Sequence, residues 1–282
     1  MRLRGTKGSR NIEDRRRQAS GGGGRRAGPI GGVGLLVVLA IGYFAGIDVT
    51  PLLQQGSAPA QSQTRQVSAQ DERAAEFSSR VLATTEQVWA QLFPQQVGRD
   101  YRTPTLVLYA DVTQSPCGGA SGATGPFYCP ADKKAYLDTD FFATLSRQLG
   151  AKGDFAAAYV IAHEVAHHVQ NELGILGQVE QLRRQSNQVE ANALTVRLEL
   201  QADCFSGIWA RLVEDLLEPG DVEEALNAAR MIGDNRLQKR AGKVPQSHTF
   251  THGTSAQRAG WFTKGFNSGD LKTCDTFSAR RL

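Results

Sequence analysis

The sequence predicts an α+β domain, mainly helical with a small sheet, preceded by one transmembrane helix. Beyond residue 70, long segments place apolar residues at helical spacing, whereas two short runs, Thr105–Tyr109 and Lys134–Asp138, have the composition of strands. An uncharged apolar run near the N-terminus is long enough to cross a bilayer. The length of 282 residues suits such an anchor followed by one globular domain.

The N-terminal region is basic and then apolar. Residues 1–28 form a basic tail, with nine Lys and Arg against two acidic residues in the first 26 positions. Residues 29–47 form the predicted transmembrane helix. The 21 uncharged residues between Arg26 and Asp48 make about 31 Å of helix, against a hydrocarbon core of about 30 Å.

The charge distribution predicts the orientation of this anchor. Basic flanks stay in the cytoplasm, so we expect a single-pass protein of the cell (inner) membrane with a cytoplasmic N-terminus and an extracytoplasmic domain. A cleaved signal peptide ending at Ala58-Pro59-Ala60 is the alternative. The basic region is too long for that alternative, and the cleavage site lies too far beyond the apolar run.

The elements of the domain follow a linker. Residues 48–70 are rich in Gln, Ser, Ala and Pro without a regular period, which predicts a flexible segment. The domain spans residues 71–282 and begins with a helix over Asp71–Leu92 that Pro94 ends. Asp221 and Glu224 suggest a variant capping box. Further helices are expected over Asp140–Leu149, Asp154–Leu173, Leu194–Leu217, Val222–Gln238 and Ser255–Phe266.

The most informative segment lies in the helix over Asp154–Leu173 and reads His163-Glu164-Val165-Ala166-His167. Residues four apart share a helix face, so His163 and His167 can bind one tetrahedral zinc ion. Glu164 is rotated about 100° from His163 and falls beside the open coordination position, where a general base belongs. His168 is one residue off this face, so we expect a surface or supporting role for it.

The third zinc ligand is expected on the next helix. Glu199 can bring a carboxylate to the metal and leave the fourth position open for water, as hydrolysis requires. Asp203 lies one turn further on, where it can accept the spare N–H of His163 or His167 and fix the tautomer. The alternative is a coincidental HExxH string with two hydrogen-bonded histidines, but the ligand types and the two helices favour zinc.

The four cysteines predict disulfides. An even count in a domain outside the cytoplasm favours pairing, and four cysteines allow three pairings. The pair Cys117–Cys129 closes a Gly-rich loop, and the pair Cys204–Cys274 would tie the C-terminal segment to the helix that carries Glu199. Free thiols and a second metal site are the alternatives, but there is no C-x-x-C spacing.

The charge balance excludes a nucleic-acid surface. The whole chain has a net charge of +4, but the basic tail accounts for more than all of it, and the rest of the chain is slightly acidic. No basic stripe with interleaved aromatic residues follows the tail. The expected partners are a peptide or protein substrate and the membrane.

Several segments resemble the putative neutral zinc metallopeptidases of bacteria. These segments are Ser9–Arg16, Phe127–Asp132, Gly153–Ala156 with His163–Gln170, Val196–Cys204 and Thr251–Arg258. The resemblance covers nearly the whole chain and implies a zincin domain of the gluzincin type, but no particular substrate. Ala166 departs from the pattern, because Gly is expected there; the extra methyl should have a small effect.

The resemblance also implies a role for the C-terminal motif. His252, or alternatively His248, is expected to reach over the site and hydrogen-bond the oxyanion of the tetrahedral intermediate. A surface turn is the plain alternative for such a loop histidine. Arg258 is expected either to orient this loop or to pair with Asp203.

Together these residues predict a membrane-anchored zinc metallopeptidase. Zinc held by His163, His167 and Glu199 would activate a water, and Glu164 would take its proton and pass it to the leaving amine. The strand Lys134–Asp138 is the expected edge along which an extended substrate aligns. The alternatives are a zinc amidase acting on cell-wall peptides and an inactive zinc-holding scaffold, against which Glu164 counts.

Overall fold

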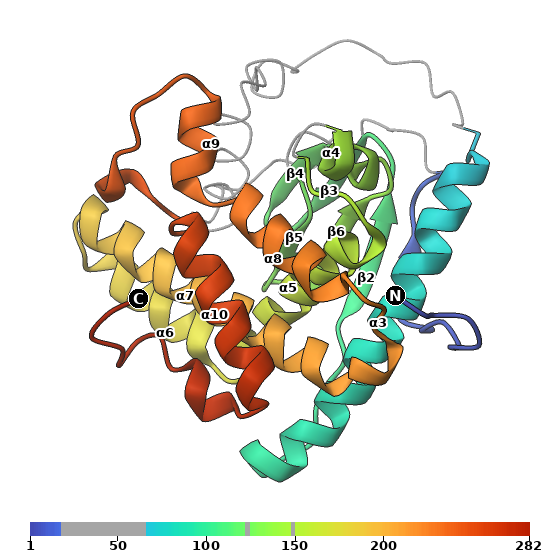
Figure 1. Cartoon of the computed structure of the whole chain (residues 1–282), viewed down its shortest axis with the longest axis horizontal. Helices are drawn as coiled ribbons and strands as arrows, with labels where there is room; N and C mark the ends of the chain where they lie inside the picture. The colour runs from blue at the N-terminus through green and yellow to red at the C-terminus, as the bar shows by residue number, and fades with distance from the viewer. Residues whose placement is uncertain (18–65, 122–124, 148–149) are drawn as a thin grey trace.

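The computed structural model describes residues 1–17, 66–121, 125–147 and 150–282, and it shows helices packed around a small sheet (Figure 1). The sheet has the order β1-β2-β6-β5, formed by β1 (Ile12–Asp14), β2 (Thr105–Tyr109), β6 (Lys134–Asp138) and β5 (Phe127–Cys129). β1 and β6 are parallel to β2, whereas β5 is antiparallel to β6. The predicted α+β class, mainly helical with a small sheet, is confirmed.

The described helices, and the hairpin beside the sheet, account for the rest of the fold. A two-stranded hairpin, β3 (Val112–Ser115) with β4 (Gly118–Ser121), follows β2. The α-helices are α3 (Ala69–Leu92), α4 (Phe141–Arg147), α5 (Asp154–Glu172), α6 (Ile175–Arg184), α7 (Gln188–Leu212), α8 (Asp221–Met231), α9 (Asp234–Arg240) and α10 (Ser255–Ser268).

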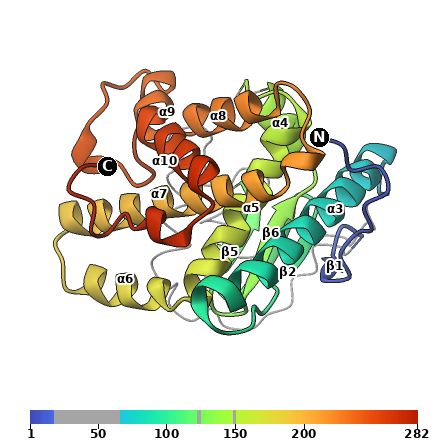
Figure 2. The same ribbon diagram turned by 60° about the horizontal axis from the view of Figure 1, so that its bottom comes forward.

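Both faces of the sheet are buried, because the strands alternate between two apolar clusters. Leu106 and Leu108 of β2 point into the main core with α3 and α5, which lie side by side over this face (Figure 2). Val107 and Tyr109 point the other way, into a smaller cluster. This cluster includes Tyr136 of β6 and Ala120 of the hairpin. The Tyr136 ring stacks on Phe127, with centroids 4.7 Å apart. The sheet is thus held from both sides.

Helix boundaries differ from the sequence prediction where caps were missed. α7 begins six residues earlier than expected, because Asn187 and Glu190 form a capping box. One helix was predicted over Val222–Gln238, but Gly233 divides it into α8 and α9. α3 ends at Leu92 as expected, yet a π-helical turn continues over Phe93–Val97.

The helices α5 and α8 both begin after a glycine, and the predicted capping box of α8 was wrong in detail. Gly153, with φ of 101°, caps α5, and Asp154 is its first helical residue. Glu224 does not close a capping box with Asp221. Its carboxylate instead accepts the Phe155 N–H at 3.0 Å, so a residue of α8 satisfies a free donor at the start of α5.

The N-terminal segment is part of this body, which differs from the separate tail expected for residues 1–28. β1 adds to the edge of the sheet beside β2, and Arg15 N–H donates to the Leu108 carbonyl. Arg16 is buried and binds Asp14 and Glu72. The Met1 amine lies 2.9 Å from Asp154. The N-terminal amine and Arg16 thus each contact an acidic side chain of the domain, Asp154 and Glu72.

The remaining predictions for the N-terminal region concern residues that the structure does not describe. The predicted transmembrane helix over residues 29–47 falls there, as does nearly all of the linker over residues 48–70. Within the part of the chain that the structure describes, no helix has the length and hydrophobicity needed to span a bilayer.

The disulfide predictions are confirmed. Cys117–Cys129 joins the hairpin turn to strand β5, and Cys204–Cys274 joins α7 to the C-terminal segment, which contains a 3-10 turn over Leu271–Cys274. Both bonds therefore brace elements that border the histidine-bearing helix.

α10 packs very closely on α7. A Cβ placed on Gly265 would lie 1.9 Å from the Cys204 carbonyl oxygen, and one on Gly207 would lie 2.0 Å from the Phe262 carbonyl oxygen. Only glycine allows the two backbones to approach this far. The close approach brings Arg258 of α10 against the side chains of α7.

Candidate metal centre

α5 and α7 bring His163, His167 and Glu199 together. His163 Nε2 lies 3.1 Å from Glu199 Oε2, and His167 Nε2 lies 3.5 Å from Glu199 Oε1. One donor atom from each of the three residues lies within 4.8 Å of the other two. Two imidazoles and one carboxylate are the protein ligands of many catalytic zinc sites. The donor set and its spacing therefore fit a zinc ion.

Each imidazole is oriented through its other nitrogen. Asp203 Oδ1 lies 3.0 Å from His163 Nδ1, and His167 Nδ1 lies 2.8 Å from Gln170 Oε1. Gln170 is itself fixed, since its amide donates to the Leu198 carbonyl at 2.7 Å. Because Nδ1 of each ring lies beside an acceptor, Nε2 is the nitrogen of each ring that faces Glu199 and is placed to bind a metal ion.

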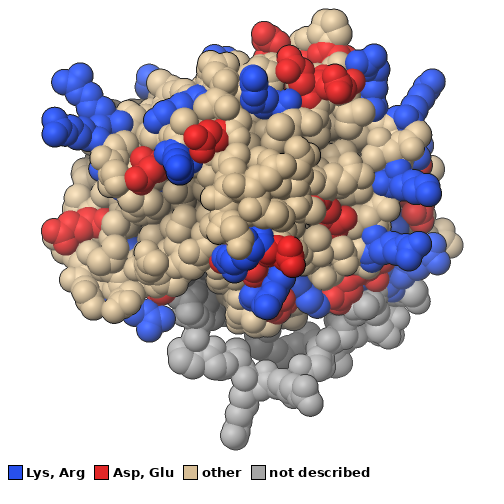
Figure 3. Space-filling model, turned by 90° about the horizontal axis from the view of Figure 1, so that it is seen from below, with Lys and Arg blue, Asp and Glu red and all other residues tan. Residues whose placement is uncertain are grey.

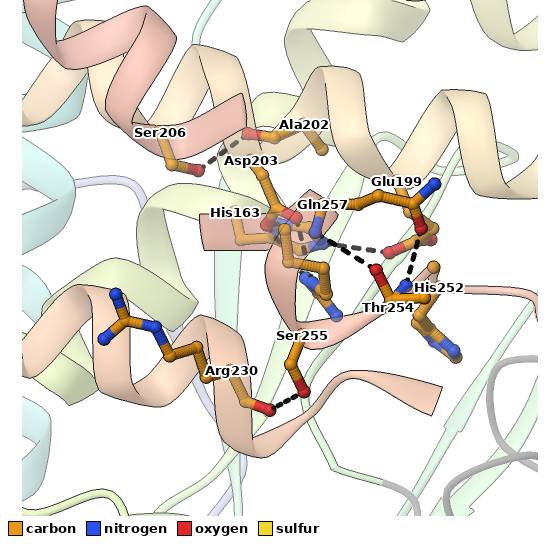
Figure 4. Close-up of polar contacts among 12 residues, drawn as sticks. His163, Glu199, Ala202, Asp203, Ser206, Arg230, His252, Thr254, Ser255 and Gln257 are labelled. Carbon is orange, nitrogen blue, oxygen red and sulfur yellow. Dashed lines mark hydrogen bonds and ion pairs between the residues drawn. The ribbon is translucent and has the colours of Figure 1, made fainter. Parts of the chain in front are cut away.

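Asp203 belongs to a buried charged group that the sequence only partly predicted. Arg258 donates to both Asp203 oxygens at 2.9 Å, and Tyr159 donates to Asp203 Oδ1 at 2.5 Å. Arg258 is 1% exposed. Of the two roles considered for Arg258, the structure shows the pairing with Asp203. Figure 4 shows Asp203 and Glu199 on the same helix, close to His163.

The ionisation of the site follows from burial and from these partners. Burial alone lowers the pKa of His163, but hydrogen bonds with Asp203 and Glu199 raise it to about 9. Burial lowers the pKa of His167 to about 4. Burial acts to raise the pKa of Glu199, yet interactions with the neighbouring imidazoles of His167, His252 and His163 hold it well below its usual range. Without a cation, these shifts favour a protonated His163 beside an ionised Glu199.

A cavity of about 310 Å³ opens beside the ligand set, and Glu164 lines it together with His163 and His167. Burial raises the pKa of the Glu164 carboxyl to about 7 in the protein without a cation. The walls are mainly apolar. Strand β5 contributes Phe127 and Tyr128, and α6 contributes Leu176 and Val179.

His252 lines the same cavity and is held by α9. Asp234 accepts the backbone N–H groups of Thr251, His252 and Gly253 at 2.8, 2.6 and 2.9 Å. The imidazole Nδ1 of His252 lies 3.0 Å from Thr251 Oγ1 and 3.4 Å from Asp234 Oδ1. The side chain of His252 is buried, and the charge of Glu199 and the contact with Asp234 raise its pKa above the ordinary value despite burial.

The other two histidines lie elsewhere. His248 is exposed and does not line the cavity. His168 is buried, binds the Tyr128 hydroxyl at 2.9 Å and lies 2.6 Å from the Arg102 carbonyl oxygen. It therefore links α5 to strand β5 and is not part of the ligand set.

Sequence reasoning missed three residues that support the site: Tyr159, Gln170 and Asp234. Two of them could have been found from the sequence. Tyr159 precedes His163 by one helical turn and Gln170 follows His167 by three residues, so both lie near the ligand face of the helix. Asp234 had none, since only the folded chain brings α9 beneath the loop that carries His252.

Comparison with known proteins agrees with this geometry. Residues 1–277 match the family described as "putative neutral zinc metallopeptidase". The chain belongs to this family. It is similar to the uncharacterized protein YpfJ of Escherichia coli (strain K12), with 46% identity covering 98% of this chain and 99% of that protein. It is also similar to the uncharacterized protein Rv2575 of Mycobacterium tuberculosis, with 44% identity covering 72% of this chain and 71% of that protein.

No solved structure shows significant similarity to the chain. The family match includes the N-terminal segment over residues 1–17, which the structure places against the domain. The segment is therefore within the unit that defines the family.

Proposed function

We propose that this member of the neutral zinc metallopeptidase family hydrolyses peptide bonds, with Glu164 as the general base. The observation that carries the proposal is the convergence of His163, His167 and Glu199 at a cavity that Glu164 also lines. The ligand set, HExxH on α5 with a Glu on α7, corresponds to the gluzincin type. The substrate is a peptide or protein chain.

The residues divide the reaction between them. Zinc, when bound, lowers the pKa of a water toward about 7 and polarises the scissile carbonyl. Glu164 takes the proton from the attacking water and delivers it to the leaving amine. Asp203 and Gln170 hold the two imidazoles in the tautomer that binds metal.

His252 is the proposed oxyanion donor. It lines the cavity, whereas His248 does not, and Asp234 with Thr251 fixes its Nδ1 side. Its raised pKa favours the protonated, donating form. A positioned donor of this kind stabilises charge that develops in the transition state.

The strand that aligns the substrate was assigned wrongly from the sequence. β6, over Lys134–Asp138, lies between β2 and β5, so both of its sides are paired. β5 is the edge strand beside the cavity, and its Phe127 and Tyr128 line the wall. We therefore propose β5 as the strand along which an extended peptide adds.

The test is Glu164→Gln in the full-length protein. The amide has nearly the volume of the acid but cannot accept the proton, so kcat for a fluorogenic peptide library should fall by about 10² to 10⁴-fold at matched zinc occupancy. Zinc content and Tm should stay close to wild type. Glu223→Gln, on the exposed face of α8, is the matched control.

The same assay, run also with peptidoglycan fragments and with an unfolded protein as substrates, separates the competing functions. A catalytically inactive scaffold predicts equal, background rates for the wild type and Glu164→Gln. A zinc amidase predicts turnover of peptidoglycan fragments with no turnover of unfolded protein. Either outcome would remove peptide-bond hydrolysis of proteins as the function.

We further propose that residues 29–47 attach the domain to a membrane and that the domain lies outside the cytoplasm. Two disulfides favour an oxidising compartment. A single membrane crossing at residues 29–47 would put residues 1–17 and the domain on opposite sides of the membrane. A cytoplasmic N-terminus therefore requires that β1 is not paired with β2 in the anchored protein.

A further inference from the structure

The wall of the cavity formed by α6 contains one buried cation. Arg183 lines the cavity, and its side chain is 9% exposed. Its Nη1 donates to Glu180 Oε2 at 3.1 Å. Leu176 and Val179 of the same helix make the surrounding wall apolar. A guanidinium in such surroundings is costly unless its donors are satisfied.

Glu180 does not balance the charge of this wall by itself. Arg184, which is 75% exposed, donates from Nε to the other Glu180 oxygen at 3.1 Å. Two guanidinium groups therefore share one carboxylate, which leaves the wall with one net positive charge. An anion in the cavity would restore neutrality.

One donor of Arg183 lacks an acceptor within the described residues. Its Nε–H is buried and has no hydrogen-bond partner there. Leaving a buried donor unpaired is costly, and native proteins rarely do so without a reason. The other guanidinium that lines the cavity, Arg258, is committed to Asp203 by two hydrogen bonds.

We propose that Arg183 binds a carboxylate of the peptide substrate and is a specificity-determining residue of the cavity. The inference rests on the proposed peptidase function. The Nε edge of a guanidinium matches a carboxylate in a bidentate pair, which a point-charge ammonium cannot reproduce. The apolar wall accepts an apolar side chain next to this carboxylate. The carboxylate comes either from an acidic side chain or from the C-terminus of the substrate.

The experiment measures binding and cleavage separately. Fluorescent peptides with a Phe-Leu core are prepared in three forms: neutral and amidated, amidated with one added Glu, and neutral with a free C-terminus. Dissociation constants are measured on full-length zinc-loaded Glu164→Gln protein, and kcat and KM are measured on protein with Glu164 intact. Both sets of measurements are made with Arg183 unchanged and with each of three further substitutions: Arg183→Gln, Arg183→Lys and the matched control Arg184→Gln.

We expect Arg183→Gln to weaken binding of at least one carboxylate peptide by about 10 to 100-fold and to raise its KM by a similar factor, with the neutral peptide unchanged. Arg183→Lys should recover only part of the affinity. Arg184→Gln removes the same charge from the same Glu180 partner but leaves the Arg183 guanidinium in place, so it should weaken binding of the carboxylate peptides far less than Arg183→Gln does and leave the neutral peptide unchanged. The peptide that loses affinity identifies the source of the carboxylate.

Equal losses for neutral and carboxylate peptides, or equal effects of Arg183→Gln and Arg184→Gln, would overturn the proposal. So would failure of the wild-type cavity to prefer either carboxylate peptide. If the peptidase function itself is wrong, no variant cleaves any peptide. The dissociation constants still decide whether Arg183 binds a carboxylate. The two failures are therefore distinguishable.

Discussion

At the metal centre each imidazole is oriented by a different kind of acceptor. A buried carboxylate, Asp203, faces His163, whereas a neutral amide, Gln170, faces His167. Asp203 is in turn balanced by Arg258, so its charge is not left alone in the core. The arrangement gives His163 the stronger acceptor and leaves His167 neutral, which suits metal binding by both rings.

Glu199→Ala should release the metal. The substitution removes one of the three ligands. Zinc affinity should therefore fall by at least the 10 to 100-fold that is typical when a residue that only hydrogen-bonds to a ligand is substituted. Zinc content after mild chelation, measured by elemental analysis, checks this. Glu180→Ala, which removes another carboxylate of the cavity, should retain zinc. Stoichiometric zinc in Glu199→Ala would refute the ligand assignment.

His252→Gln should lower kcat with little change in zinc content. Loss of a single oxyanion donor costs about 10² to 10³-fold in other hydrolases. Asp234→Asn should produce a smaller loss, because it loosens the loop that holds the imidazole. His248→Gln is the control, since His248 is exposed and outside the cavity. Equal activities for the two histidine variants would remove the oxyanion role.

At the scale of elements, the position of Arg258 depends on how closely α10 approaches α7. The contact uses Gly207 and Gly265, where any Cβ would overlap a carbonyl oxygen of the facing helix. The Cys204–Cys274 disulfide joins α7 to the segment that follows α10. Helix spacing, rather than local sequence, thus sets the distance between Arg258 and Asp203.

Gly265→Ala should push the helices apart. The added Cβ would lie only 1.9 Å from the Cys204 carbonyl oxygen, so the helices must shift. The shift should cost about 1–3 kcal/mol and weaken the Arg258–Asp203 pair, lowering Tm by several degrees and reducing zinc affinity. Gly260→Ala on the same helix meets nothing within 4 Å and should stabilise the protein by about 0.5–1 kcal/mol. Thermal melts and zinc titrations of both variants provide the check; similar melting temperatures would show that the helix contact is not tight.

At the scale of the whole molecule, the N-terminal segment closes one edge of the sheet. β1 pairs with β2, and Lys134 of β6 reaches Glu13 at 2.5 Å. The segment therefore lies on the same side of a membrane as the domain whenever this pairing is present.

On the face of the molecule drawn in Figure 3, Lys and Arg side chains are interspersed with Asp and Glu side chains. This face therefore carries no large patch of one charge.

Single cysteines at Lys7 and Lys239, both exposed positions, test the pairing of β1 with β2. In intact cells that carry the full-length protein, a membrane-impermeant maleimide should label both cysteines or neither. Labelling of Lys239→Cys alone would place the two segments on opposite sides of the membrane and show that β1 is not paired with β2 in the cell. Wild-type protein, whose four cysteines are disulfide-bonded, gives the background.

The sequence by itself determined the features that depend on local spacing. The i, i+4 histidines predicted one helix face, and short β-rich runs predicted β2 and β6 with their observed bounds. An even cysteine count predicted both disulfides. These signals are readable because each depends on residues near each other in the chain or on composition.

The tertiary structure alone decided which strand is an edge, where residues 1–17 lie and which groups support the ligands. β5 is too short for its sequence to show a period, and only strand order makes it the edge beside the cavity. Asp234 reaches the His252 loop, and Arg183 the cavity wall, through packing between separate helices. Such contacts join residues far apart in sequence, so their energy comes from burial and hydrogen bonds that exist only once the chain has folded.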